Sequence, residues 1–150
     1  MTTELKPEAF DAQQYFERIY ARPVILEAKK LSQIFKHGKA ERTVLNQLDL
    51  KIHKREFICV IGPSGCGKST FSRIVAGLDP YSSGELLMDG EQITGPSQER
   101  GMVFQGYTLF PWKTVKENVM FGPQMKGASN PLAEAQAREW INIIGLDKYE

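Results

Sequence analysis

Chemistry is concentrated in one glycine-rich stretch, residues 62 to 70, which reads Gly-Pro-Ser-Gly-Cys-Gly-Lys-Ser-Thr. Glycines lack a Cβ, so the backbone can turn with positive φ and approach a polyphosphate closely. Successive backbone N–H groups of such a turn point into one concavity that suits phosphate oxygens. We therefore predict a phosphate-binding loop here.

Two side chains at the end of this loop complete the predicted site. Lys68 can reach the β- and γ-phosphates as a point charge, and the Ser69 hydroxyl can ligate Mg²⁺. A helix that begins near Lys68 adds unpaired N–H groups and the positive end of its dipole. The spacing G-x-x-x-x-G-K-S is the signature of P-loop nucleotide hydrolases. Nucleotide contacts are predicted for Gly62, Pro63, Ser64, Gly65, Cys66, Gly67, Lys68, Ser69 and Thr70.

The segments on either side of the loop favour the strand, loop and helix order that such a site requires. Residues 57–61 are apolar and β-prone, which predicts a buried parallel strand. Residues 68–77 predict a helix with Phe71 and Ile74 on one face and Gly77 at its end. The loop should therefore join the core of an α/β domain.

An antiparallel β region is predicted ahead of the loop. Residues 24–31 and 43–45 read as strands, and apolar residues alternate with polar ones from Leu48 to Ile52. This period of two is typical of a half-buried antiparallel strand. An antiparallel β lead-in therefore precedes the α/β core.

Two further strands are predicted after the first helix. Residues 85–88 lead into Asp89-Gly90, a dipeptide typical of a hairpin turn. The short apolar run 101–104 reads as a strand that ends at Gln105. An aromatic-rich segment follows directly behind it.

Two helices are predicted in the last third of the chain. Thr114, with Glu117 at the spacing of a capping box, should start a helix over residues 115–121. Asn130 as cap, with Pro131 in the first turn, should start another that ends before Gly145. The apolar residues of this last helix lie near a period of 3.6 and are Leu132, Ala135, Trp140, Ile143 and Ile144.

Residues 1–23 form a separate N-terminal extension. A helix is predicted over residues 8–21, and Pro23 should stop it. We expect it to pack loosely on the domain; the alternative is a helix that docks a partner through its aromatic residues.

Composition is that of a soluble globular protein. Of the 150 residues 41% are hydrophobic and 25% charged, and the net charge of +1 gives no reason to expect a nucleic-acid partner. No apolar run is long enough to span a bilayer, and the N-terminus does not read as a secretory signal. The two cysteines, Cys59 and Cys66, do not form a disulfide framework. The expected location is the cytoplasm.

From residue 24 to residue 150 the sequence resembles the ATP-binding subunit of an ABC transporter. The resemblance rests on the phosphate-binding loop followed by Ala76-Gly77-Leu78, on residues 83–90, and on Val103-Phe104-Gln105. It continues through residues 109–119. The sequence Leu-Phe-Pro-Trp in this stretch is similar to that of ATP-binding subunits from importers of nitrate, sulfonates and taurine. The fold so implied is α/β: a P-loop NTPase (RecA-like) core with an antiparallel β lead-in and the start of an α-helical subdomain.

The resemblance implies roles for individual residues and a cofactor, Mg-ATP. Gln105 matches the glutamine that senses the γ-phosphate and Mg²⁺, so it joins Lys68 as a catalytic residue and Ser69 as a metal ligand. Phe35 matches an aromatic residue that stacks on adenine, since stacking requires only a π-face. Packing of Phe35 in the core remains the alternative.

Two protein partners are also implied. Tyr107, Phe110 and Trp112 lie where the family receives a cytoplasmic helix of the membrane permease, although core burial of one or two of them is an equal alternative. The other partner is a second ATP-binding subunit, in a homodimer that holds two Mg-ATP. The implied location is the inner face of the cell membrane, through the permease.

The sequence departs from the family pattern in two places. Arg55 stands in a turn that usually carries Gly, and we expect a different turn type there. The family's Leu-Ser-Gly-Gly signature, its Walker B strand and its switch His are absent from the 150 residues. We therefore expect a truncated copy or a fragment that binds nucleotide weakly and does not hydrolyse it alone, although full-length relatives hydrolyse ATP.

Two other functions stay open on the sequence. One is a non-catalytic nucleotide-binding or interaction module, since the catalytic half of the family pattern is missing. The other is a kinase with the same loop, but the stretch after the first helix holds the Asp89-Gly90 hairpin instead of an arginine-rich lid. The transported solute cannot be named from this chain.

Overall fold

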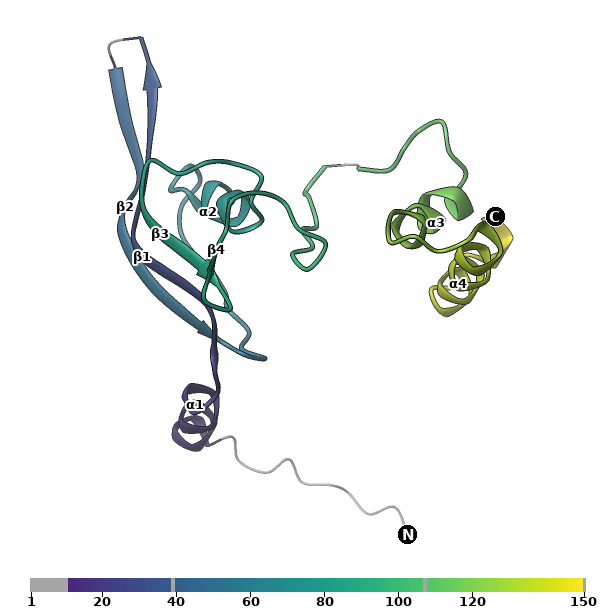
Figure 1. Cartoon of the computed structure of the whole chain (residues 1–150), viewed down its shortest axis with the longest axis horizontal. Helices are drawn as coiled ribbons and strands as arrows, with labels where there is room; N and C mark the ends of the chain where they lie inside the picture. Colours follow the sequence, from purple (N-terminus) through teal and green to yellow (C-terminus); the bar gives the residue numbers. More distant parts are fainter. Residues whose placement is uncertain (1–10, 39, 107, 150) are drawn as a thin grey trace. The chain divides into compact units, whose positions relative to one another are not determined.

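The computed structural model describes residues 11–38, 40–106 and 108–149, and these divide into two compact units between Met102 and Val103. Each unit is described by itself (Figure 1). The first contains α1 (Ala12–Tyr20), β1 (Val24–His37), β2 (Ala40–His53), α2 (Lys68–Val75), β3 (Ser83–Met88) and β4 (Glu91–Gln92). The second contains α3 (Val115–Met125), α4 (Asn130–Ile143) and the 3₁₀ helix η1 (Asp147–Tyr149).

The first unit is built on a four-stranded antiparallel sheet of order β2-β1-β3-β4. The predicted β lead-in is confirmed, but its strands are longer than expected. β1 runs on to His37, and the predicted strands at residues 43–45 and 48–52 are one continuous strand, β2. Left-handed residues at Lys30 and Gln47 allow this continuity, because they absorb the register shifts between the two strands.

Helix α2 packs against this sheet and closes the core. Phe71 and Ile74 are buried, as predicted from their spacing, and join leucines of all three long strands. The buried cluster consists of Leu26, Ala28, Leu31, Leu45, Phe71, Ile74, Leu86 and Ile93. The predicted hairpin after β3 is also confirmed, with left-handed φ of 50° at Asp89 and 85° at Gly90.

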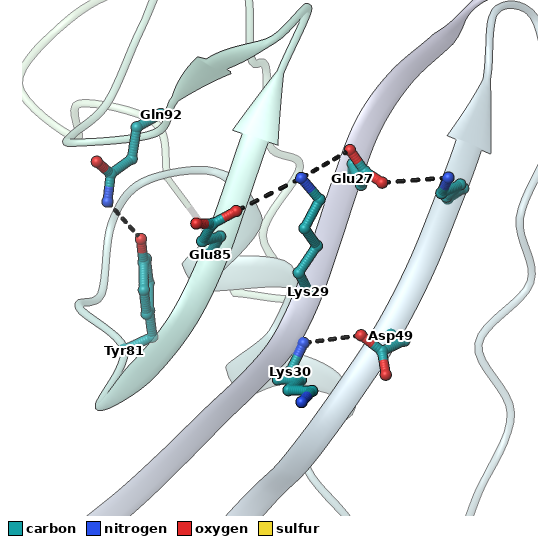
Figure 2. Close-up of polar contacts among 8 residues, drawn as sticks. Glu27, Lys29, Lys30, Asp49, Tyr81, Glu85 and Gln92 are labelled. Carbon is teal, nitrogen blue, oxygen red and sulfur yellow. Dashed lines mark hydrogen bonds and ion pairs between the residues drawn. The ribbon is translucent and has the colours of Figure 1, made fainter.

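Charged side chains form a ladder across the first three strands (Figure 2). The Glu27 carboxylate on β1 lies 3.2 Å from Lys51 Nζ on β2 and 3.4 Å from Lys29 Nζ, and Lys29 lies 3.5 Å from Glu85 on β3. The hydrogen bond from Lys51 is the main cause that lowers the pKa of Glu27. These groups are largely solvated, so the ladder helps to align strands rather than to perform chemistry.

Two predicted strands do not form, the parallel strand at residues 57–61 and the short apolar strand at residues 101–104. Residues 57–61 are irregular, with Phe57 86% and Ile61 87% exposed, and residues 101–104 are irregular with an exposed Val103. A parallel strand takes its hydrogen bonds from strands that are distant in sequence. No strand of the described ranges pairs with either segment, so their β-prone composition is not enough.

The turn at Arg55 also differs from expectation. We expected a turn that avoids positive φ, but Arg55 adopts φ of +61°. The turn is fixed on both sides, because Glu56 N donates to His53 O at 3.0 Å and His53 N donates to the Glu56 carboxylate at 2.7 Å. Arg55 therefore bears the cost of a left-handed conformation, about 1 kcal/mol.

The N-terminal helix α1 begins after Asp11, whose carboxylate caps Gln14 N, and ends before Pro23. Residues 8–10 of the predicted helix lie outside the described residues. Ile19 is buried, and the Tyr20 ring meets the His53 ring edge-on at 5.2 Å. The helix is thus attached to the sheet by its last turn, while Phe16 is exposed.

In the second unit α3 and α4 pack against each other. The capping box is confirmed: Glu117 N donates to Thr114 Oγ1 at 3.2 Å, and Thr114 N donates to the Glu117 carboxylate at 2.8 Å. Helix α3 continues beyond the predicted residue 121 to Met125 and includes Pro123. The cap of α4 is Ser129 rather than Asn130.

The buried face of α4 is not the predicted one. Its buried residues are Ala133, Ala137 and Ile141, spaced by four. Small alanines at this spacing allow two helices to approach closely, and this contact outweighs the burial of larger side chains elsewhere on the helix. The apolar residues that the period of 3.6 indicated are exposed: Leu132, Ala135, Trp140, Ile143 and Ile144.

Candidate nucleotide-binding site

The glycine-rich loop lies between the irregular segment 57–61 and the first turn of α2. Gly65 and Gly67 adopt left-handed φ of 77° and 106°, as predicted, whereas Gly62, for which positive φ was also predicted, does not. Gly67 is buried against β2, where a Cβ would lie 2.9 Å from Val44 Cγ1 and 3.1 Å from Val44 O. Only glycine fits at this position, so the sheet holds the end of the loop in place.

Helix α2 presents its first turn to the loop. Its N-cap is Gly67, and no side chain caps the helix there. The N–H groups at the start of α2 are therefore available to an anion, and the helix dipole favours negative charge at this end. Ser69 is exposed in this turn, and Thr70 is half-buried.

Lys68 is positioned by the loop itself. Its Nζ donates to Gly62 O at 2.7 Å and to Pro63 O at 2.8 Å, which bridges the start and the end of the loop. An ammonium group has three donors, and the third makes a long contact of 3.8 Å with Cys66 Sγ. A phosphate oxygen is a much stronger acceptor than a thiol sulfur, so Lys68 can keep both carbonyls and also bind a phosphate.

The residues present fit a phosphate with its magnesium ion. Among the described residues no three His, Cys, Asp or Glu side chains gather as a metal site. Magnesium does not need such a cage, because it retains waters and is usually shared between substrate phosphates and one or two protein oxygens. The exposed Ser69 hydroxyl, next to Lys68, is suited to be that oxygen.

One residue near the loop was missed by the sequence reading. Arg42, on β2, donates from Nη2 to Gly65 O at 3.2 Å. The two residues are 23 positions apart, and no motif links them. An arginine in a strand ahead of a glycine-rich loop is the only signal that could have suggested the contact.

A hollow of about 470 Å³ opens beside the loop, between β2 and the segment 58–61. Its walls include Leu45, Leu48 and Phe71 on one side and Cys66 and Lys68 at the loop. The lining of this hollow is mainly apolar. The segment 57–61, which would cover these apolar side chains if it packed on the sheet as a strand, does not do so.

The family model described as ABC transporter matches residues 45–150, a range that begins within β2 and includes the whole loop and all of the second compact unit. The chain belongs to the ABC transporter family. Its resemblance over the loop and the residues behind it is thereby confirmed, and so is the P-loop fold that the resemblance implied.

Curated relatives agree with this assignment. The chain is 42% identical over 127 residues to an uncharacterized ABC transporter ATP-binding protein of Methanocaldococcus jannaschii, which covers 85% of this chain and 48% of that protein. It is 41% identical over 121 residues to the nitrate import ATP-binding protein NrtD of Synechocystis sp., with 81% and 46% covered. The same identity over 121 residues holds for the aliphatic sulfonates import ATP-binding protein SsuB of Bacillus thuringiensis, with 81% and 47% covered. The chain spans about half the length of these relatives.

Solved structures show the same cassette fold. A dimeric ATP-binding cassette in a post-hydrolysis state, bound to ADP and phosphate, matches with a TM-score of 0.73 at 28% identity. The match covers 83% of this chain and 60% of that one.

Phe35, the predicted adenine platform of this ABC cassette, lies on β1 opposite Arg42 of β2. It is 47% exposed and lies outside the buried cluster, so the core-packing alternative is not supported. An exposed ring face is what stacking on a base requires.

Gln105 belongs to the second unit, whereas the loop belongs to the first. It is exposed and follows the exposed Val103 and Phe104. Its role toward the γ-phosphate and Mg²⁺ in the ABC site stays a prediction.

The predicted permease-binding residues differ in exposure. Trp112 is 76% exposed, whereas Phe110 is half-buried, with its ring 4.7 Å from that of Phe121 and 5.5 Å from that of Trp112. Tyr107 lies outside the described residues. Phe110 thus anchors the aromatic segment, and Trp112 is the residue that a partner could cover.

Asn118 holds this aromatic segment in shape. Its Oδ1 accepts from Phe110 N at 2.8 Å, and its Nδ2 donates to Phe110 O, Lys113 O and Thr114 O at 3.2, 3.2 and 2.9 Å. The side chain therefore supplies the acceptor for Phe110 N and adds a donor to Phe110 O and Thr114 O, which also accept from Lys113 N and Asn118 N. No helix in the described part of the chain is long and apolar enough to cross a membrane.

Proposed function

We propose that this chain binds Mg-ATP through the loop at residues 62–70 and acts within the energy-coupling subunit of an ABC importer. The carrying observation is Lys68, which bridges Gly62 O and Pro63 O beside an uncapped helix start. Lys68 would bind the β- and γ-phosphates, Ser69 and Gln105 would ligate Mg²⁺, and Phe35 would stack on adenine. Magnesium, when bound, neutralises charge on the phosphates.

The proposed cargo is a small anion such as nitrate, a sulfonate or taurine. Support comes from relatives named as nitrate and aliphatic sulfonate import proteins. Residues 24–150 would be the N-terminal portion of the ATP-binding domain, and residues 1–23 an extension to it. The proposed assembly is a pair of ATP-binding subunits on a permease, at the inner face of the cell membrane.

The full-length protein would hydrolyse ATP, whereas these 150 residues alone would bind nucleotide without turnover. Lys68 and the loop amides position and neutralise the phosphates. The family motifs that activate water are absent from this sequence. A non-catalytic nucleotide-binding module is therefore the second candidate for the 150-residue chain.

Calorimetric titration of the purified chain with Mg-ATP tests the proposal. We expect binding that Lys68→Ala weakens by at least tenfold, since charged hydrogen bonds to phosphate contribute about 1.5–3 kcal/mol each. Lys36→Ala removes the same charge from the exposed β1–β2 hairpin and should leave affinity nearly unchanged. Equal affinity of Lys68→Ala and wild type would refute the site, and steady ATP turnover lost in Lys68→Ala would refute the lack of hydrolysis.

A further inference from the structure

The contact between Arg42 and the loop suggests a part of the nucleotide site that lies outside the loop motif. Arg42 is on β2, directly opposite Phe35 on β1, so both side chains belong to the same face of one hairpin. Arg42 Nη2 donates to Gly65 O at 3.2 Å. Two residues further along β2, Val44 packs under Gly67. One strand therefore contacts the loop at two points.

The hydrogen bond to Gly65 O also determines where the next N–H points. Gly65 O and Cys66 N belong to the same peptide group, and in a planar trans peptide the C=O and N–H bonds point in opposite directions. With its carbonyl held by Arg42, this peptide directs Cys66 N–H toward the inside of the loop. There it makes only a long contact of 3.4 Å with Pro63 O, which a phosphate oxygen can replace.

We propose that Arg42 is a positioning residue of the nucleotide site: it orients the Gly65–Cys66 peptide so that the Cys66 N–H faces the phosphates. The inference rests on the proposed function, since it assumes that a polyphosphate occupies the loop. The guanidinium also places a positive charge beside the loop. The ligand that fits this arrangement is a nucleoside polyphosphate, with its base at the hairpin and its phosphates in the loop.

Affinity measurements on hairpin variants test the role of Arg42. Wild type, Arg42→Ala, Arg42→Lys and Lys36→Ala are titrated with Mg-ATP and with inorganic tripolyphosphate. Lys36 is the matched control, because it carries the same charge on the same hairpin but pairs with Glu41 at 3.1 Å. We expect Arg42→Ala to weaken both ligands about three- to tenfold, the range of one exposed charged hydrogen bond. Arg42→Lys should recover most of this loss, because a single donor is used.

A spectroscopic readout follows the peptide itself. The chain has two cysteines, so labelling with ¹⁵N-cysteine yields amide signals for Cys59 and Cys66 alone. Arg42→Ala should shift the Cys66 signal in the free protein and reduce its response to tripolyphosphate. Lys36→Ala should leave it in place, and far-ultraviolet circular dichroism reports whether a variant remains folded.

The outcomes separate this inference from the proposed function. If wild type binds ATP and Lys68→Ala does not, but Arg42→Ala matches Lys36→Ala in affinity and in the Cys66 signal, the role of Arg42 is wrong and the function stands. If wild type binds neither ligand, the proposed function fails. In that case Arg42 no longer positions a nucleotide site, even if its contact with Gly65 is confirmed by the Cys66 signal.

Discussion

Replacement of Gly77 by alanine tests how closely α2 and the segment after β4 approach each other. Gly77 ends α2 with φ of +75° and completes a Schellman motif, in which Gly77 N donates to Ile74 O and Leu78 N donates to Arg73 O, both at 2.9 Å. A Cβ at this position would overlap the Gly95 carbonyl and lie 2.9 Å from Pro96 N. Because Arg100 also donates to Gly95 O, the carbonyl cannot move away without losing that hydrogen bond.

Gly127 provides the matched control. It ends α3 with φ of +85° and the same pair of hydrogen bonds, but nothing lies within 4 Å of a Cβ built there. Gly127→Ala therefore bears only the left-handed cost of about 1–2 kcal/mol, partly offset by a less flexible unfolded chain. Gly77→Ala bears this cost and also an overpacking cost of about 1–3 kcal/mol. The two variants should differ by the overpacking cost alone.

Hydrogen exchange under native conditions measures both variants locally, which suits a chain with two compact units. Peptides that cover α2 and β3 report on Gly77→Ala, and peptides that cover α3 report on Gly127→Ala. The opening free energy around α2 should fall by about 2–4 kcal/mol, against about 1 kcal/mol around α3. If both variants lose the same opening free energy, the close approach of Gly77 to Gly95 is refuted. If neither variant loses opening free energy, the left-handed conformation of Gly77 and Gly127 is refuted as well.

Two other substitutions test local features of the fold. Arg55→Gly should raise the free energy of unfolding by up to about 1 kcal/mol in chemical denaturation, because glycine adopts φ of +61° without strain. Lys54→Gly is its control and should destabilise; a loss of stability in Arg55→Gly would contradict the turn geometry. Asn118→Ala should destabilise the aromatic segment by about 1–3 kcal/mol, since the Phe110 N–H loses its acceptor while Phe110 O keeps only the hydrogen bond from Lys113 N. Exchange at residues 110–114 should accelerate strongly in Asn118→Ala and less in Asn118→Asp, which keeps the acceptor; unchanged exchange in both would contradict the role of Asn118.

Features that depend on neighbours in sequence were predicted well. The capping box of Thr114 and Glu117 forms because both partners lie within one helical turn. The Asp89-Gly90 hairpin and the left-handed Gly67 likewise depend on local backbone preferences. The same reasoning explains the family resemblance, since the loop motif is a run of consecutive residues.

Features that depend on partners distant in sequence were not predicted correctly. The run 57–61 has the composition of a buried strand, but a strand exists only where another strand lies alongside it. The apolar set that the sequence indicated for α4 includes Leu132 and Trp140, which are exposed, whereas close packing buries Ala133 and Ala137. The periodicity of apolar residues indicates that a helix has an apolar side. Which side is buried depends on the size of the side chains at the contact with the neighbouring helix.

The sequence by itself was enough to predict a phosphate-binding loop of three glycines, a lysine and a serine, because every group required lies within nine residues. Only the tertiary structure decided what holds that loop. Val44 under Gly67 and Arg42 on Gly65 come from a strand some 20 residues earlier, and they reach the loop because β2 passes beneath it. The chemistry is therefore local, and the shape in which it is presented depends on contacts that no motif records.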